Sequence, residues 1–123
     1  MMSKILLVED DPLLIDIYTT KFKEYDFEVQ VENDGAKVVE QVKKFKPDLV
    51  VLDIVLPHMD GWDILRQIRN DKQLRKTKIL ILSNLGQKDE VDRGMGLGVM
   101  KYLIKADYTP TQVADEIQKL LQI

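Results

Sequence analysis

The chain of 123 residues contains no cysteine, a single histidine and no long apolar run. The lack of cysteine excludes a disulfide scaffold, a cysteine-ligated metal site and a thiol nucleophile. Basic side chains are outnumbered by acidic ones, 18 against 21, which argues against the positive footprint of a nucleic-acid-binding protein. No apolar run approaches the ~18 residues of a membrane span, and the first residues lack a signal-peptide pattern. We therefore expect one cytoplasmic domain over residues 1–123, with no membrane and no direct nucleic acid as partner.

Short apolar runs recur along the chain and predict a parallel sheet. Four of them, residues 5–8, 49–52, 79–82 and 102–104, are too short for helices and apolar on both faces. Strands that are covered on both sides of a parallel sheet have this composition. A fifth run, residues 27–32, alternates between apolar and polar side chains, as a half-exposed edge strand does.

Segments with helical spacing separate these runs. Apolar side chains recur three or four residues apart in three of them, namely at Val38, Val39, Val42 and Phe45, at Ile64, Leu65 and Ile68, and at Val113, Ile117, Leu120 and Leu121. Asp11-Pro12 and Thr109-Pro110 are typical helix starts, and Gln112 adds a capping box to the second. Five alternations of strand and helix predict an α/β fold with a doubly wound, flavodoxin-like parallel sheet, strand order 2-1-3-4-5, and five helices.

Polar side chains follow four of the expected strands at the point where each ends. Glu9-Asp10-Asp11 follow the first strand, Asp53 the third, Ser83 the fourth and Lys105 the fifth. In such sheets the carboxyl ends of the strands meet at one edge, so we expect these side chains to converge. Clustered carboxylates need a cation among them, and oxygen ligands without histidine or cysteine favour Mg²⁺. Lys105 would balance an anion, and the whole set suits phosphoryl transfer.

With these motifs the chain resembles, over essentially its whole length, the receiver domain of two-component response regulators, in its single-domain, chemotaxis-regulator-like form. The motifs are Leu7 to Asp11, Leu52 to Gly61, Ser83, Tyr102 and Lys105 to Asp107. The resemblance implies that Asp53 accepts a phosphoryl group from a phosphohistidine of a sensor histidine kinase or phosphotransfer protein. It implies that Asp10, Asp11, Asp53 and the backbone carbonyl of Val55 hold Mg²⁺. Self-phosphorylation and autodephosphorylation would be the only reactions catalysed.

The same resemblance implies a conformational switch that controls a downstream protein. Ser83 and Lys105 would contact the phosphoryl oxygens, and Tyr102 would be the aromatic switch residue. The first helix carries more apolar side chains than one core-facing stripe requires. The resemblance favours its flank at Leu14, Ile15 and Tyr18, next to the Pro110 loop, as the surface on which the kinase docks.

One position and one short stretch depart from the pattern of that family. The residue after the lysine is usually a proline in a cis bond, and here it is Ala106. The loop therefore either holds a strained non-proline cis bond or runs differently. Gly94, Gly96 and Gly98 crowd the end of the fourth helix, which we expect to be the weakest of the five.

Other functions remain open at this stage. An aspartyl-phosphate phosphohydrolase would want a second acid two residues after the nucleophile, where Val55 stands. A flavin or nucleotide binder would open its first loop with serine, threonine or glycine, whereas Glu9-Asp10-Asp11 would repel phosphate. A receiver-like interaction module that no longer accepts phosphate is the third alternative, although no acceptor-site residue is missing.

Overall fold

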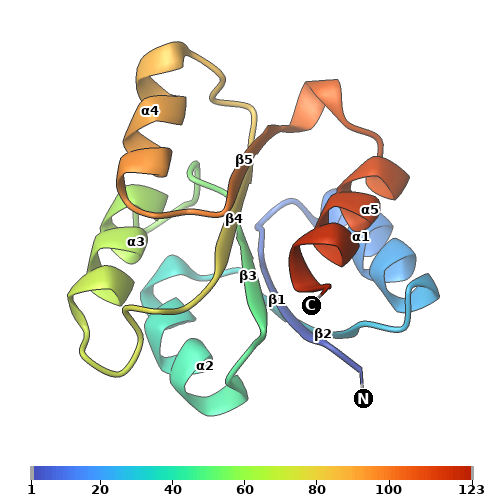
Figure 1. The fold of residues 1–123 in the computed structure, drawn as a ribbon, viewed down its shortest axis with the longest axis horizontal. Helices are drawn as coiled ribbons and strands as arrows, with labels where there is room; N and C mark the ends of the chain where they lie inside the picture. Colours follow the sequence, from blue (N-terminus) through green and yellow to red (C-terminus); the bar gives the residue numbers. More distant parts are fainter. Residues whose placement is uncertain (1, 123) are drawn as a thin grey trace.

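A computed structural model describes residues 2–122 as five parallel strands and five α-helices in alternation (Figure 1). The strands are β1 (Lys4–Val8), β2 (Glu28–Glu32), β3 (Leu49–Leu52), β4 (Ile79–Ser83) and β5 (Lys101–Ile104). The helices are α1 (Pro12–Glu24), α2 (Val38–Phe45), α3 (Gly61–Asn70), α4 (Lys88–Gly96) and α5 (Pro110–Leu121), with 3₁₀ turns at Gly35–Lys37 and Lys105–Asp107. The strand order β2-β1-β3-β4-β5 confirms the predicted flavodoxin-like sheet.

The sheet is covered on both faces, as its apolar strands predict. Alternate side chains of β1 point to opposite sides: Leu6 and Val8 pack with α2 and α3, while Ile5 and Leu7 pack with α1 and α5. Figure 1 shows these helices on the two sides of the sheet, with α4 beside α3. The central strand β3 is buried at every residue, whereas the edge strand β2 is mostly half-exposed. Burial of these two apolar layers is the main source of stability for such a fold.

Polar side chains cap the starts of three helices, two of them at the residues that the sequence indicates. The Asp11 carboxylate accepts bonds from the backbone N–H groups of Leu13 and Leu14, and Asp60 accepts one from Trp62. Thr109 and Gln112 form the reciprocal capping box at α5. Each cap satisfies N–H groups that have no partner inside the helix, and so sets where the helix starts.

The Arg69 side chain, at the end of α3, donates hydrogen bonds to two other segments at the amino edge of the sheet. Its guanidinium donates to the carbonyl oxygens of Leu97 (2.7 Å) and Gly98 (3.2 Å), directly after α4. It also donates to the carbonyl oxygens of Arg75 (3.1 Å) and Thr77 (2.8 Å), before β4. A side chain at the end of α3 thereby fixes the carboxyl end of α4.

Two further features bear on the expectations from the sequence. The described residues contain no cis peptide bond, so the loop after Lys105 runs differently from the proline form and makes a 3₁₀ turn. Within residues 2–122, none of the helices has the length and apolar character needed to cross a bilayer.

Candidate phosphoacceptor site

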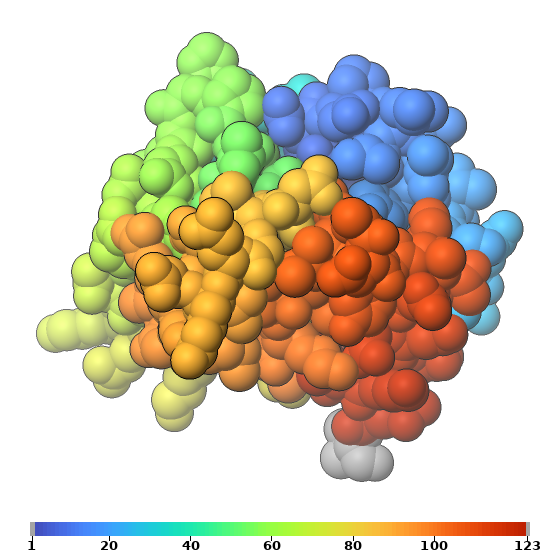
Figure 2. All heavy atoms as spheres, turned by 90° about the horizontal axis from the view of Figure 1, so that it is seen from above, coloured from blue at the N-terminus to red at the C-terminus, as the bar shows by residue number. Residues whose placement is uncertain are grey.

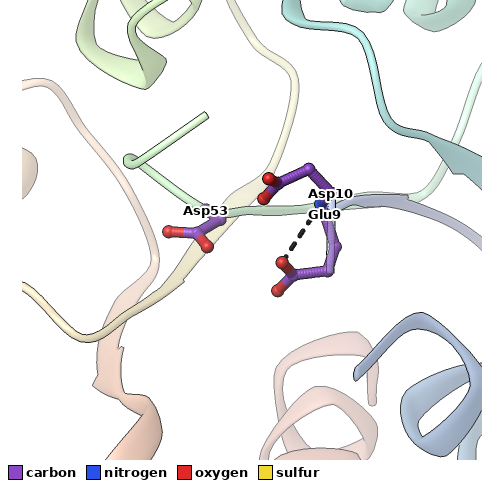
Figure 3. Close-up of side chains that lie close together, drawn as sticks. All are labelled: Glu9, Asp10 and Asp53. Atoms are coloured by element: carbon purple, nitrogen blue, oxygen red, sulfur yellow. Dashed lines mark hydrogen bonds between the residues drawn. The ribbon is translucent and has the colours of Figure 1, made fainter. Parts of the chain in front are cut away.

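Three carboxylates converge at the carboxyl edge of the sheet. Glu9 and Asp10 directly follow β1, Asp53 directly follows β3, and these are neighbouring strands. Each side chain offers an oxygen that lies within 4.8 Å of the oxygens of the other two. Figure 3 shows the three side chains around one space, and Figure 2 looks down on this edge of the molecule. Glu9 and Asp53 are buried, whereas Asp10 is exposed, so the cluster is accessible from one side.

Lys105 connects two of these carboxylates. Its Nζ lies 2.6 Å from Glu9 Oε1 and 2.6 Å from Asp53 Oδ2. Burial alone would lower the pKa of the Lys105 ammonium, but the hydrogen bonds to Asp53 and Glu9 and the charges of both raise it above its usual value. The lysine is therefore firmly cationic, as we expected for a residue that balances an anion. One positive charge still faces three carboxylates.

The structure changes the membership of the acidic cluster. Asp11 was expected beside Asp10 and Asp53, but its carboxylate accepts hydrogen bonds from the first turn of α1 at 2.9 and 3.4 Å. Glu9 takes the third place in the cluster, and its Oε2 accepts from the N–H groups of Asp10 and Asp11 at 3.1 and 3.2 Å. The sequence placed Glu9 in the group expected to converge, as the first residue after the apolar run, but Glu9 was left out of the expected metal ligands. The proline after Asp11 already indicated that this carboxylate caps the helix.

The Asp53 carboxylate is held from two directions. Its Oδ1 accepts from the backbone N–H of Val55 at 3.1 Å, while Lys105 binds Oδ2. The Val55 side chain points outward and is 59% exposed. His58, the single histidine, is exposed on the same loop.

Ser83 and Tyr102 lie on the neighbouring strands β4 and β5. Ser83 is fully buried, and its Oγ accepts from the N–H of Leu85 at 3.3 Å. The Tyr102 hydroxyl donates to the carbonyl oxygen of Leu85 at 2.7 Å. Burial, with the charges of Glu90 and Asp53, raises the pKa of Tyr102 to about 12. Both expected switch residues therefore bond to the same residue of the loop that follows β4.

The expected docking surface is only partly accessible. Tyr18 was wrongly included, because it is 3% exposed and packs on Phe22 inside the core between α1, α5 and the sheet. Leu14, Ile15 and Pro110 are half-buried. Leu13, which sequence reasoning did not single out, is 67% exposed. Helical periodicity gives part of this signal, because Leu14, Tyr18 and Phe22 are spaced four residues apart on one stripe that packs on the core, whereas Leu13 lies off that stripe.

The donor set fits a hard divalent cation. It consists of carboxylate oxygens, with no histidine or cysteine in the cluster. Mg²⁺ prefers such oxygen ligands and keeps several waters, which an open side of the site allows. The charge of Lys105 leaves the cluster with excess negative charge, which a cation would offset.

Comparison with known proteins agrees with this geometry. Residues 5–118 match the family described as the response regulator receiver domain. The DNA-binding response regulator MtrA of Mycolicibacterium smegmatis is 32% identical over 99% of this chain and 52% of its own length. The transcriptional regulator RpaA of Synechocystis sp. is 32% identical over 85% of this chain and 43% of its own length. The chain thus spans about half the length of these curated relatives.

Solved structures agree on the fold. The BeF₃-activated N-terminal receiver domain of RstA from Klebsiella pneumoniae is 30% identical, with a TM-score of 0.84 over 97% of this chain and 99% of its own. The chemotaxis protein CheY4 of Vibrio cholerae superposes with a TM-score of 0.88 over 98% of this chain and 100% of its own, and its 23% identity shows the fold alone.

Receiver domains are phosphoacceptor signalling domains rather than enzymes of the usual kind, they bind Mg²⁺ or Mn²⁺ at an acidic pocket, and they interact with histidine kinases or phosphotransfer proteins. A fold, an acidic edge and a sequence match over 114 residues (118 − 5 + 1) all point the same way. The chain therefore belongs to the receiver domain family of two-component response regulators.

Proposed function

We propose that Asp53 is the phosphoacceptor and that it takes its phosphoryl group from a phosphohistidine of a sensor histidine kinase or phosphotransfer protein. The observation that carries this proposal is the buried contact of Lys105 with both Asp53 and Glu9, each at 2.6 Å. An ammonium has three donors, and these two bonds use two of them. The third is left for an oxygen of the incoming phosphoryl group.

The transfer needs little covalent work from the protein. The N–P bond of the phosphohistidine breaks as a bond forms between phosphorus and an Asp53 carboxylate oxygen, and the electron pair of the N–P bond returns to the imidazole. Catalysis then consists of placing Asp53 in line and neutralising the phosphoryl oxygens. Bonds from Val55 N–H and Lys105 fix the orientation of the carboxylate, while Lys105 supplies one of the positive charges.

Asp10, Asp53 and the backbone carbonyl of Val55 are the proposed Mg²⁺ ligands; Glu9 belongs to the same acidic cluster but is not a proposed ligand. When bound, Mg²⁺ supplies the remaining positive charge for the phosphoryl oxygens. The role of Glu9 is to orient neighbouring groups: one of its oxygens accepts a hydrogen bond from Lys105, and the other accepts from backbone N–H groups of the β1–α1 loop.

Leu13, Leu14 and Ile15, beside Pro110, are the proposed docking surface for the phosphodonor protein. Leu13 is the most exposed apolar side chain among those that the structure describes, and it lies at the acidic edge. Exposed apolar side chains next to a site favour a protein partner. The downstream target is a protein that responds to the switch formed by Ser83 and Tyr102, and the cytoplasm remains the predicted location.

Intact mass spectrometry tests the phosphoacceptor. The chain is incubated with acetyl phosphate and Mg²⁺, and we expect a gain of one phosphoryl group that Asp53→Asn abolishes. Asp48→Asn is the matched control, because Asp48 is an exposed aspartate before β3 that accepts from Lys4 N–H at the opposite edge. Phosphorylation that persists in Asp53→Asn would refute the assignment, and turnover of phosphoesters would favour a phosphohydrolase.

A further inference from the structure

Helix α4 differs from its neighbours in how it packs on the rest of the domain. All nine of its residues are described, and none of them has a buried side chain. Its single buried residue is Gly94. By contrast, α3 buries Trp62, Ile64, Leu65 and Ile68, and α5 buries Val113, Ala114 and Ile117. The N-cap of α4, Gln87, makes no side-chain bond to the helix. Since helices in proteins are normally held by an apolar face, other contacts must position α4.

One such contact joins α4 to α3. The guanidinium carbon of Arg93 lies 4.4 Å from the centroid of the Trp62 ring. Within residues 2–122, no carboxylate lies within 4.0 Å of Arg93. Stacking on the indole is therefore the specific interaction of this side chain.

Trp62 belongs to a rigid part of the site. Its backbone N–H donates to Asp60 Oδ1 at 2.8 Å, and the residue is only 4% exposed. The preceding Gly61 lies so close to the residues after β3 that an added Cβ would be 2.5 Å from Ile54 Cα and 2.8 Å from the carbonyl oxygen of Asp53. Arg93 thus holds α4 to the loop that carries the phosphoacceptor.

The next residue of α4 contacts the switch tyrosine. A Cβ added at Gly94 would be 2.9 Å from Tyr102 Cδ2 and 3.0 Å from Ile81 Cδ1, so the helix backbone rests on the Tyr102 ring. The hydroxyl of the same ring donates to Leu85, on the loop that leads into α4. Consecutive residues, Arg93 and Gly94, therefore connect α4 to the phosphoacceptor loop and to Tyr102.

We propose that Arg93 is a positioning residue of the switch: by stacking on Trp62 it holds α4 over Tyr102 and so keeps the tyrosine ring beneath Gly94. A planar guanidinium suits this contact better than the compact ammonium of lysine. Cation–π contacts at accessible sites are weak, so this one can break during a conformational change without unfolding the domain. The role of this contact in signalling rests on the proposed phosphoryl transfer. The contact itself is present in the unphosphorylated chain.

Hydrogen exchange of the unphosphorylated protein tests the contact. We expect Arg93→Ala to speed amide exchange in residues 88–96 by about two- to fivefold, the factor that corresponds to an exposed cation–π contact. Trp62 is the one tryptophan in the sequence, and its fluorescence should be quenched more strongly by a soluble quencher in this variant. Arg93→Lys should give a smaller change in both. Lys88→Ala removes an exposed cation from the same helix and should give neither effect. Exchange in Arg93→Ala that equals wild type, or that Lys88→Ala reproduces, would overturn the proposal.

A second variant tests the other half of the connection. Gly94→Ala adds a methyl group where the Tyr102 ring lies, so the ring should move toward solvent. The pKa of the Tyr102 hydroxyl should then fall from about 12 toward 10. An unchanged tyrosine titration would show that the α4 backbone does not hold the ring. Intact mass after acetyl phosphate treatment separates the two proposals, because Arg93→Ala should still gain one phosphoryl group. If wild type gains none while the exchange result holds, the proposed function fails and the contact stands.

Discussion

At the scale of single residues, the Lys105 ammonium makes the two most buried ion pairs among the described residues. It lies between Glu9 and Asp53, and the three side chains are at most 10% exposed. We expect Lys105→Met to lower the free energy of unfolding by about 3 kcal/mol, since it leaves buried carboxylates without their cation. Urea denaturation measures this cost. Adding Asp53→Asn to the variant should recover part of the loss, and equal stability of single and double variants would contradict the account.

Tyr102 predicts a pH dependence of stability. Its pKa of about 12 in the folded state lies above the value near 10 of an unfolded tyrosine. Between these values the folded state binds more protons, so its stability falls as the pH rises from 10 toward 12, and below pH 10 this contribution is constant. Ultraviolet titration of tyrosinate should show a late step that Tyr102→Phe removes. A late step that survives in this variant would belong to another tyrosine.

Residue identity alone could not assign every site side chain. Asp53 and Lys105 were predictable because each directly follows a short apolar run, residues 49–52 and residues 102–104. Tyr18 and Leu13 were misjudged for a physical reason: residues 12–18 of the first helix are apolar except for Asp16, so composition does not reveal which side of these turns faces the core. Contacts such as Arg93 on Trp62 join residues 31 positions apart (93 − 62), and no local pattern predicts them.

At the scale of elements, caps and strand patterns were the most predictable features. The capping box at α5 and the proline starts depend on a few adjacent residues, and the structure confirms them. The geometry of Asp11 was the exception: its Oδ1 accepts the N–H bonds from Leu13 and Leu14, and its carboxylate is not among the three whose oxygens lie within 4.8 Å of one another.

This reassignment of Asp11 can be tested at α1. We expect Asp11→Ala to lower the free energy of unfolding by about 1 kcal/mol, and Asp11→Ser, which retains an N-cap acceptor, to restore most of it. Mg²⁺ affinity, measured by calorimetry, should stay close to wild type in both variants and fall in Asp10→Ala. A stable Asp11→Ser protein that no longer binds Mg²⁺ would make Asp11 a ligand after all.

At the scale of the whole molecule, the acidic edge couples metal binding to folding. The three carboxylates of Glu9, Asp10 and Asp53 face one ammonium, and they come together only in the folded chain. Mg²⁺ at about 100 times its dissociation constant should therefore raise the free energy of unfolding by about 2.7 kcal/mol. Thermal melts with potassium chloride at equal ionic strength provide the control.

The same argument gives the metal-free protein a measurable signature. Asp53→Asn removes one of the three negative charges, so it should melt at a higher temperature than wild type without Mg²⁺ and gain less from its addition. If melts depend neither on Mg²⁺ nor on this substitution, the carboxylates do not interact as the geometry indicates.

The bonds of Arg69 have a consequence for how α4 can move. They fix Leu97 and Gly98 to the end of α3, whereas the opposite end of α4 begins at Gln87 without a side-chain cap. Because the contacts of α4 are concentrated near its carboxyl end, we expect any displacement of the helix to grow from Gly96 toward Lys88. The first turn of α4 then sweeps the largest arc, and it is the turn nearest to Leu85. A partner that responds to displacement of α4 should therefore contact this first turn, because only surfaces that differ between states can favour one of them.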